Sequence, residues 1–284
     1  MAMPASTRRM ALGLLAALSV LLAGCLLTPG KFSSELSVRR DGTFAYSYRG
    51  DIVLLGLTQL ADKTTDATLG EFTPSACHDE KTFAERKCTD ADLAQQKSEW
   101  DAGKEAAKKK RQDDAEMMKT MLGGIDPSDP RAAEEFAARL RRQVGWRSVV
   151  SKGKGVFEVD FAITGRIDHD FLFPTIERMP VITPFVTIVR RTDGTVRIDA
   201  PAFTQNAGGS NPMLGMMSGM SEAQAEREKS GVPALDGTFA LVTDGDVLAN
   251  NTDEGAVAVP GGKRLAWKVD VRTTAPPSAL IKLR

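Results

Sequence analysis

The sequence predicts an α+β fold in which an antiparallel β body, either sandwich-like or a strongly curved sheet, carries an inserted helical hairpin. Three observations support this prediction. Apolar and polar residues alternate in short runs on both sides of residues 89–146. Asp-Gly pairs separate several of these runs, as in tight β-turns. The block between them is rich in Ala, Lys, Glu, Gln and Met, which favour helix.

Composition and charge narrow the class of protein. The 284 residues are 42% hydrophobic and 26% charged, as in ordinary globular domains. Lys plus Arg and Asp plus Glu are equal at 37 each. A nucleic-acid binder needs a basic surface to neutralise phosphates, so this balance argues against nucleic acid as a partner.

The N-terminus has the layout of an export signal. Arg8 and Arg9 precede an apolar run from Met10 to Leu22, and Leu22-Ala23-Gly24-Cys25 follows. This last motif resembles the lipobox of bacterial lipoproteins, in which the signal is cleaved before a cysteine that becomes diacylated. The resemblance implies a signal peptide at residues 1–24 and a lipid anchor on Cys25. We expect residues 25–34 to form a lipidated tether.

The resemblance also implies a location. In Gram-negative sorting, aspartate after the lipidated cysteine marks retention in the inner membrane, and here Leu26 occupies that position. We therefore expect a cell-envelope protein held by its acyl groups, in the outer membrane and facing the periplasm if the host is Gram-negative.

The two remaining cysteines lie close together in the sequence. Cys77 and Cys88 enclose a short polar segment that begins with His78. Disulfides persist outside the cytosol, so export favours a bridge between them. The alternative is a metal site formed by the two thiolates and His78.

The first elements after the tether read as a hairpin and a helical pair. Leu36 and Val38 precede the turn Asp41-Gly42, and Phe44, Tyr46 and Tyr48 follow it in alternation. Thr89 and Asp92 form a capping box at the start of a long solvated helix over residues 90–122, which Gly123-Gly124 ends. Asp129 and Pro130 then start a second helix. Its predicted buried face carries Ala133, Phe136, Ala137, Leu140 and Val144.

The second half of the chain returns to strand patterns. Residues 156–161 alternate, with Phe157, Val159 and Phe161 on one side. A hairpin follows around Asp193-Gly194, and Asp236-Gly237-Thr238 is predicted as a third turn of the same kind. The last strands carry Leu265, Trp267, Val269, Ile281 and Leu283.

The C-terminal quarter is similar to a known family. Thr243-Asp244-Gly245-Asp246, Asn250-Asn251, Pro260-Gly261-Gly262 and the strand Leu265–Val269 resemble the LppM-type lipoprotein domain of bacterial envelopes. The opening hairpin also fits that family. The resemblance implies a fold more strongly than a ligand, although lipid or glycolipid contact is the function most often suggested for the family.

Motifs that carry chemistry are sparse. The sequence holds two histidines and lacks the nucleophile elbow, the Walker loop and the zinc-protease motif. His169, between Asp168 and Asp170, reads as a solvated turn. The acidic stretch from Asp244 to Glu254 reads as turn residues, with calcium as the alternative. We predict no catalytic residue, no metal and no cofactor.

A methionine cluster is the most unusual feature. Met213, Met216, Met217 and Met220 form two Met-x-x-Met pairs. They are either a core plug or flexible cover, a contact for a lipid or partner, or a Cu(I) site with thioether ligands.

These observations favour a non-enzymatic, lipid-anchored envelope protein that acts as an interaction or assembly module. The alternative is a module that binds a lipid or another amphiphile. We expect one β-rich domain at residues 35–284, with residues 89–146 inserted, and an envelope protein or lipid as partner.

Overall fold

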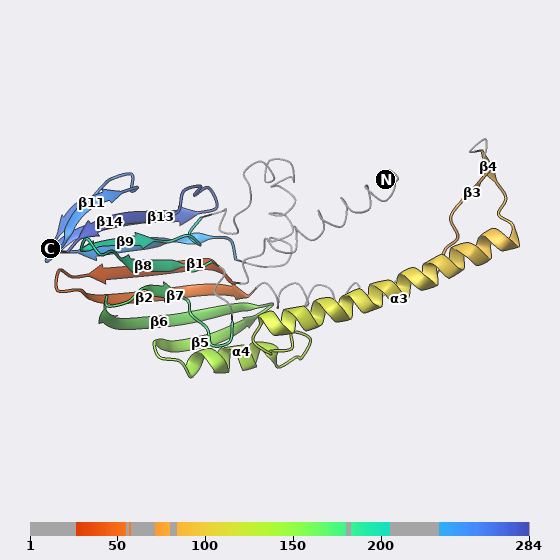
Figure 1. Cartoon of the computed structure of the whole chain (residues 1–284), viewed down its shortest axis with the longest axis horizontal. Helices are drawn as coiled ribbons and strands as arrows, with labels where there is room; N and C mark the ends of the chain where they lie inside the picture. Colours follow the sequence, from red (N-terminus) through yellow and green to blue (C-terminus); the bar gives the residue numbers. More distant parts are fainter. Residues whose placement is uncertain are drawn as a thin grey trace, which may run out of the picture.

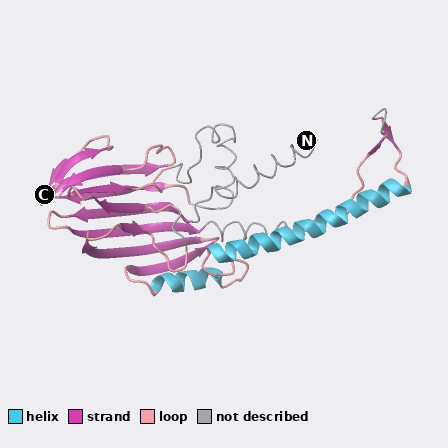
Figure 2. Ribbon diagram, viewed as in Figure 1, coloured by secondary structure: helices cyan, strands magenta, loops and turns pink. Residues whose placement is uncertain are grey.

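The protein folds as two stacked β-sheets with a long helix that projects from one end (Figures 1 and 2). The computed structural model describes residues 27–54, 57, 72–79, 84–179, 183–204 and 233–283. The arrangement confirms the predicted α+β class. It also resolves the choice between a curved sheet and a sandwich in favour of the sandwich.

The larger sheet has seven strands in the order β12-β13-β10-β1-β2-β6-β5. Neighbouring strands are antiparallel except β1 and β10, which run parallel. In chain order the strands are β1 (Leu27–Val38), β2 (Thr43–Leu54), β5 (Trp146–Gly153), β6 (Val156–Arg166), β10 (Asp236–Thr243), β12 (Val257–Val259) and β13 (Gly262–Asp270).

The smaller sheet has five strands in the order β11-β14-β9-β8-β7, all antiparallel. These strands are β7 (Phe171–Phe173), β8 (Val186–Arg190), β9 (Thr195–Asp199), β11 (Asp246–Asn250) and β14 (Ser278–Lys282). A separate two-stranded ribbon, β3 (Cys77–His78) with β4 (Glu85–Arg86), lies at the far end of the long helix (Figure 1). The helices are α3 (Asp90–Met121) and α4 (Ala132–Arg141).

Aromatic side chains fill the space between the two sheets. Tyr46 and Tyr48 of β2 both contact Phe173 of β7, with ring centroids 5.1 and 5.4 Å apart. Phe203 stacks on Phe32 at 4.3 Å and meets Phe239 of β10 at 5.6 Å. Such ring contacts add to the free energy gained by burying the apolar surface itself. The interleaved rings therefore hold the sheets together.

The predicted tether is wrong. β1 begins at Leu27, so residues 27–34 belong to the sheet and pair with β2. Thr28, Pro29 and Gly30 read as a linker because proline and glycine are usual in loops. The register shifts between Pro29 and Phe32, which accommodates the proline inside the strand.

Two of the three Asp-Gly turns are confirmed. Asp41 and Asp193 each accept hydrogen bonds from the backbone and hydroxyl of the threonine two residues later, at the tips of β1–β2 and β8–β9. The third prediction is wrong, because Asp236, Gly237 and Thr238 lie inside β10. Gly237 is needed there for close approach: an added Cβ would lie 2.4 Å from the carbonyl oxygen of Phe32.

The helices form where predicted, with two differences. α4 begins at Ala132, not at Pro130, and Arg131 is its N-cap without a side-chain hydrogen bond. Phe136, Ala137 and Leu140 are buried as predicted, whereas Val144 is 85% exposed beyond the helix. Because α4 lies against β5 and supplies core residues, it belongs to the sandwich and is not part of a free hairpin.

We predict that Phe203→Ala destabilises the sandwich by about 3–5 kcal/mol, because the ring is fully buried between both sheets and its loss leaves a cavity. Urea denaturation measures the change. Leu248→Ala, at a side chain 52% exposed on β11, is the control and changes stability by less than about 0.5 kcal/mol. Similar losses in the two variants would contradict the role of the aromatic layer.

Candidate functional site

The most distinctive feature is an arm that extends from one end of the sandwich. We define the arm as residues 72–79 and 84–116, which comprise the β3–β4 ribbon and most of α3. At 1.5 Å per residue, the 32 residues of α3 span about 48 Å. Figure 1 shows that β3 and β4 lie at the end of α3 far from the sheets. The arm therefore carries its tip well away from the body.

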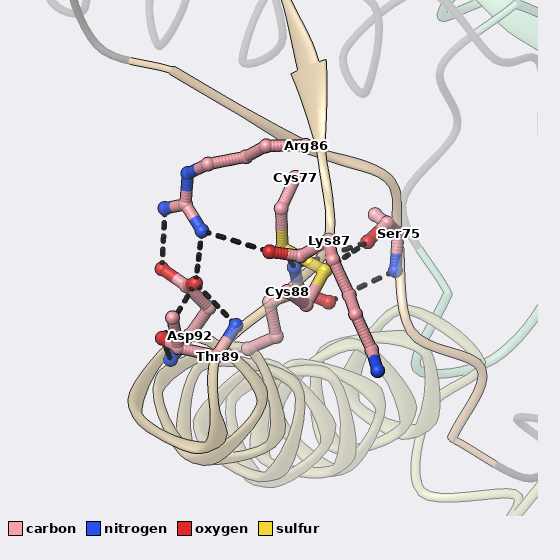
Figure 3. Close-up of a disulfide and its surroundings, with 8 residues drawn as sticks. Ser75, Cys77, Arg86, Lys87, Cys88, Thr89 and Asp92 are labelled. Carbon is pink, nitrogen blue, oxygen red and sulfur yellow. Dashed lines mark hydrogen bonds and ion pairs between the residues drawn. A yellow bond between two sulfur atoms is a disulfide. The ribbon is translucent and has the colours of Figure 1, made fainter.

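A disulfide holds the tip together (Figure 3). Cys77 in β3 is bonded to Cys88, which immediately precedes the helix cap, and their Cα atoms are 5.2 Å apart. The structure thus confirms the bridge predicted from the export context. In the chain-entropy model a loop of this length is worth about 3 kcal/mol. Both cysteines are consumed by the bridge, so they are not free thiolate ligands for a metal.

The first turn of α3 is fixed by a network around Asp92 (Figure 3). Arg86 of β4 donates two hydrogen bonds to this carboxylate, at 2.6 and 3.0 Å. The backbone N–H of Thr89 donates to the same carboxylate at 2.8 Å, and the Thr89 hydroxyl accepts from the N–H of Asp92, which completes the predicted capping box. The hydrogen bonds from Arg86, and then those from Thr89, hold the pKa of Asp92 below its usual value. The network joins the ribbon to the helix.

A second contact runs alongside the disulfide. The side-chain amide of Gln96 accepts from the backbone N–H of Ser75 at 2.9 Å and donates to the carbonyl of Ser75 at 3.2 Å. This two-way pairing lays residues 72–78 against α3, so the tip is a double-layered structure and not a bare helix end.

An aromatic and cationic cluster lies on the arm behind the tip. Phe72 meets Trp100 edge to face at 5.9 Å. The ammonium of Lys104 lies 4.8 Å from the Trp100 ring, and that of Lys97 lies 5.8 Å from it. Trp100 is half-buried, whereas Trp146 and Trp267 belong to the sandwich core. The cluster presents an indole and two ammonium groups on the arm's surface.

The middle of the arm is solvated and charged. Every residue from Asp101 to Lys110 is exposed except Ala107, which is half-buried. Lys97 pairs with Asp101 one turn along the helix, and exposed pairs of this kind add little to stability. This stretch has no partner surface within the described part of the chain, so its side chains are available for contacts with another molecule.

The root of the arm is packed into the sandwich. Met118 and Met121 lie against the core, and Leu122 is fully buried. The guanidinium of Arg139 in α4, itself only 7% exposed, donates to the carbonyls of Leu122 and Gly123 at the end of α3. Gly123 has φ +64°, and a Cβ there would lie 2.7 Å from the carbonyl oxygen of Arg178. The helix therefore leaves the body from a fixed base.

A second feature is a groove on the outer face of the larger sheet. It is open to solvent and has a volume of about 600 Å³. The side chains of Tyr46 and Ile163 pack towards the core, and the other lining residues are small, hydroxyl-bearing or charged. The lining residues are Ser33, Glu35, Ser37, Ala45, Tyr46, Ser47, Arg49, Arg147, Asp160, Ala162, Ile163 and Thr164. No pattern in the sequence predicts this groove. The alternation within each strand identifies outward-facing residues, but it does not show which strands are neighbours.

Several predicted site residues lie outside the described part of the chain. These are Cys25 with its lipobox, and the cluster Met213, Met216, Met217 and Met220. His169 is described: its Nδ1 lies 2.5 Å from a carboxylate oxygen of Asp168, and both side chains are largely exposed. This is the solvated turn that the sequence predicts.

The acidic stretch near residue 250 has structural roles. Asp244 and Asp246 both bind Arg40, at 2.7 and 2.9 Å. The side-chain oxygen of Asn251 accepts from the indole N–H of Trp267 and from the backbone N–H of Ser278. Within the described residues, no group of three or more His, Cys, Asp or Glu side chains gathers as a metal site would require.

The comparisons with known proteins are sparse. No family model matches the chain, and no curated protein matches it. Among solved structures it is similar to the NMR structure of the folded domain of LppM from Mycobacterium tuberculosis. That similarity covers 91% of this chain and 92% of the other, with 8% sequence identity and a TM-score of 0.29. A TM-score of this size does not establish a shared function. No helix in the described part of the chain has both the length and the apolar character of a membrane span.

We predict that the double substitution Cys77→Ser and Cys88→Ser loosens the tip and leaves the sandwich intact, because the bridge lies outside the aromatic core. Limited proteolysis measures the effect as faster cleavage within residues 79–96. The midpoint of thermal unfolding of the sandwich changes by less than about 3 °C. Global unfolding of the variant would contradict this separation.

We also predict a pH-dependent first turn of α3. The folded pKa of Asp92 lies below its unfolded value of about 3.9, so its contribution to stability is complete above that pH and is lost as pH falls through the folded pKa. Carboxyl ¹³C titration of Asp92 therefore has its midpoint below about 3.9. Asp92→Asn lowers the helical shifts of residues 90–93 at neutral pH, whereas the control Asp101→Asn leaves them unchanged. A midpoint at or above the usual value contradicts the network.

Proposed function

We propose that the protein is a non-enzymatic, lipid-anchored module of the bacterial cell envelope that uses the arm to contact a partner. The observation that carries the proposal is the geometry of the arm: a solvated helix of about 48 Å with a fixed root and a cross-linked tip. A long polar helix that packs only at its root buries little apolar surface, so its outer turns add little to the stability of the protein. Contact with another molecule gives it a use.

The anchor is inferred from the sequence at Cys25. β1 starts two residues later, so the lipid would hold the sandwich close to the membrane without an intervening linker. Two residues span at most about 7 Å. With the sandwich held next to the membrane, only an element that projects from it can reach a partner that does not touch the sandwich itself. The arm projects from the end of the sandwich where β1 begins (Figure 1).

The chemistry of the arm favours a partner with acidic or mixed character. The cluster combines the half-buried ring of Trp100 with the ammonium groups of Lys104 and of Lys97, which also pairs with Asp101, and aromatic residues are enriched in protein interfaces. We propose an envelope protein as this partner, and the outer membrane as the site if the host is Gram-negative. The groove is open and mixes four charged side chains with hydroxyl and apolar groups, so it is not the closed apolar cavity that an acyl chain would need.

We predict that replacing residues 72–114 with a flexible Gly-Ser linker abolishes partner contact and leaves the sandwich folded. The replacement keeps Met118, Met121 and the core residues of α4, which a deletion of residues 89–146 would remove. The replacement removes Glu105, so the full chain and the variant are compared by pull-down of the partner through an affinity tag. In the full chain, site-specific photo-crosslinking in living cells from Glu105, which is exposed on the arm, locates the contact, with a crosslinker at Lys268 on the sheet as control. A discrete adduct is expected from Glu105 in the full chain.

The same cells test the anchor, because Cys25→Ser is expected to move the protein from the membrane fraction to the soluble fraction. Equal adducts from Glu105 and Lys268, or an adduct that survives an independent Trp100→Ala and Lys104→Glu double substitution unchanged, would contradict the role of the arm. Retention of the Cys25→Ser variant in membranes would contradict the anchor alone.

A further inference from the structure

The groove on the larger sheet is shaped by small side chains between charged ones. Ser47 of β2 lies opposite Ala162 of β6 on one side and Glu35 of β1 on the other. Ala45, one register position along on the same face, lies opposite Ser37 and Thr164. Small residues on three adjacent strands leave depth above the sheet, and the hydroxyl groups make that floor polar. The outer face is thus hollowed where most sheets carry long side chains.

A β-bulge in β5 lies at Arg147, whose guanidinium forms part of one wall of the groove. Trp146 pairs with Phe161, whereas Ser148 pairs with Asp160, so the register shifts by one residue at Arg147. The bulge interrupts the alternation, so that two successive side chains, Arg147 and Ser148, are both exposed between the buried Trp146 and Val149. Arg147 is exposed and lines the groove. Its guanidinium makes no hydrogen bond or ion pair with any other described residue.

The other charges of the groove are paired. Arg49 donates to Oδ2 of Asp160 at 3.1 Å, and Glu35 accepts from Arg264 at 2.8 Å. Arg147 therefore gives the groove one uncompensated positive charge. A ligand with a single negative charge matches it, whereas a dianion would face the nearby carboxylates of Glu35 and Asp160 with a surplus of charge.

Asp160 sets a second requirement for the ligand, in addition to a single negative charge. Its Oδ1 is shielded from solvent and has no hydrogen-bond partner among the described residues, unlike Oδ2. A shielded carboxylate oxygen without a donor is costly, and such an atom calls for an explanation. A ligand in the groove reaches this oxygen only when the carboxylate turns Oδ1 towards the groove, and a ligand hydroxyl group there would then satisfy it. The ligand must therefore carry a donor as well as an anion.

We propose that this groove is a binding site for a hydroxylated monocarboxylate, a sugar acid of the uronic acid class. Its carboxylate pairs with the guanidinium of Arg147 in the bidentate geometry that arginine favours. One of its hydroxyl groups donates to the Asp160 carboxylate once Oδ1 has turned towards the groove, and others meet the serine and threonine hydroxyls of the floor. The volume of this open groove, about 600 Å³, lies within the range of small-molecule sites. This site is independent of the arm and does not rest on the function proposed above.

The test is an NMR titration of the ¹⁵N-labelled protein, residues 26–284, with D-glucuronate and with D-galacturonate up to tens of millimolar. Saturable shifts are expected at the amides of residues 147–149, 160–162 and 45–49. Glucose lacks the carboxylate and acetate lacks the hydroxyls, so both are expected to bind at least about tenfold more weakly.

Substitutions assign the roles. Arg147→Ala is expected to weaken glucuronate binding by about tenfold or more, and Arg147→Lys to restore part of it. Arg142→Ala, at an exposed arginine beyond α4, is the matched control and leaves binding unchanged. Asp160→Asn replaces an acceptor by an amide and is expected to weaken binding while the spectrum stays dispersed.

Several outcomes would overturn the proposal. One is the absence of saturable shifts with both sugar acids, and another is equal binding of acetate and glucuronate. Binding that survives Arg147→Ala, or that Arg142→Ala weakens as much, would show that surface arginines attract the anion without a defined site.

Discussion

The contact between the aromatic faces of the two sheets is the constraint on which the rest of the structure depends. Tyr46 and Tyr48 project from β2 into rings carried by β7 and by Phe185 before β8. Their hydroxyl groups are fully buried but satisfied: Tyr48 donates to the carbonyl of Asp51 at 2.8 Å, and Tyr46 is hydrogen-bonded to Ser34 at 3.1 Å. Burial raises the pKa of both tyrosines, so both stay protonated and neutral at physiological pH. The rings give the sandwich its core without leaving a buried charge.

This constraint determines what the outer surfaces can do. Successive side chains of a strand point to opposite faces of the sheet. One face of the larger sheet packs into the core, so the side chains on the other face are exposed to water. The small residues of the groove therefore take no part in packing the core. The root of the arm uses the same core, since Leu122 and Phe136 are buried within it. A rigid sandwich thus supports a projecting arm at one end and a polar groove on its outer face.

Local signals in the sequence predicted a large part of this fold. The two Asp-Gly hairpins, the capping box of α3 and the disulfide all depend on residues close together in the chain. The start of β1 was missed because Thr28-Pro29-Gly30 resembles a linker, and only pairing with β2 makes it a strand. The parallel pairing of β1 with β10 joins residues about two hundred positions apart and turns an apparent Asp-Gly turn into strand. Non-local pairing of this kind leaves no local pattern.

The candidate sites follow the same division. The tip of the arm was foreseen in part, because a disulfide and a helix cap are short-range features. The contact of Phe72 with Trp100 and the groove of Arg147 and Asp160 depend on segments that meet only in the folded chain. The groove also needs a bulge, whose position the alternation around Trp146 does not reveal. A face of small residues became visible as a hollow only when β1, β2 and β6 were found to be neighbours.

The arm and the groove are built to act independently. The tip is fixed by its own disulfide and by the network of Arg86, Thr89 and Asp92, none of which lines the groove. The groove depends on β1, β2, β5 and β6, whose register is fixed by the aromatic core. Substitutions at sites that share no partner have additive effects on stability. The proposed partner contact through the arm and the proposed ligand binding in the groove therefore depend on different residues, so a substitution that impairs one is expected to leave the other unchanged.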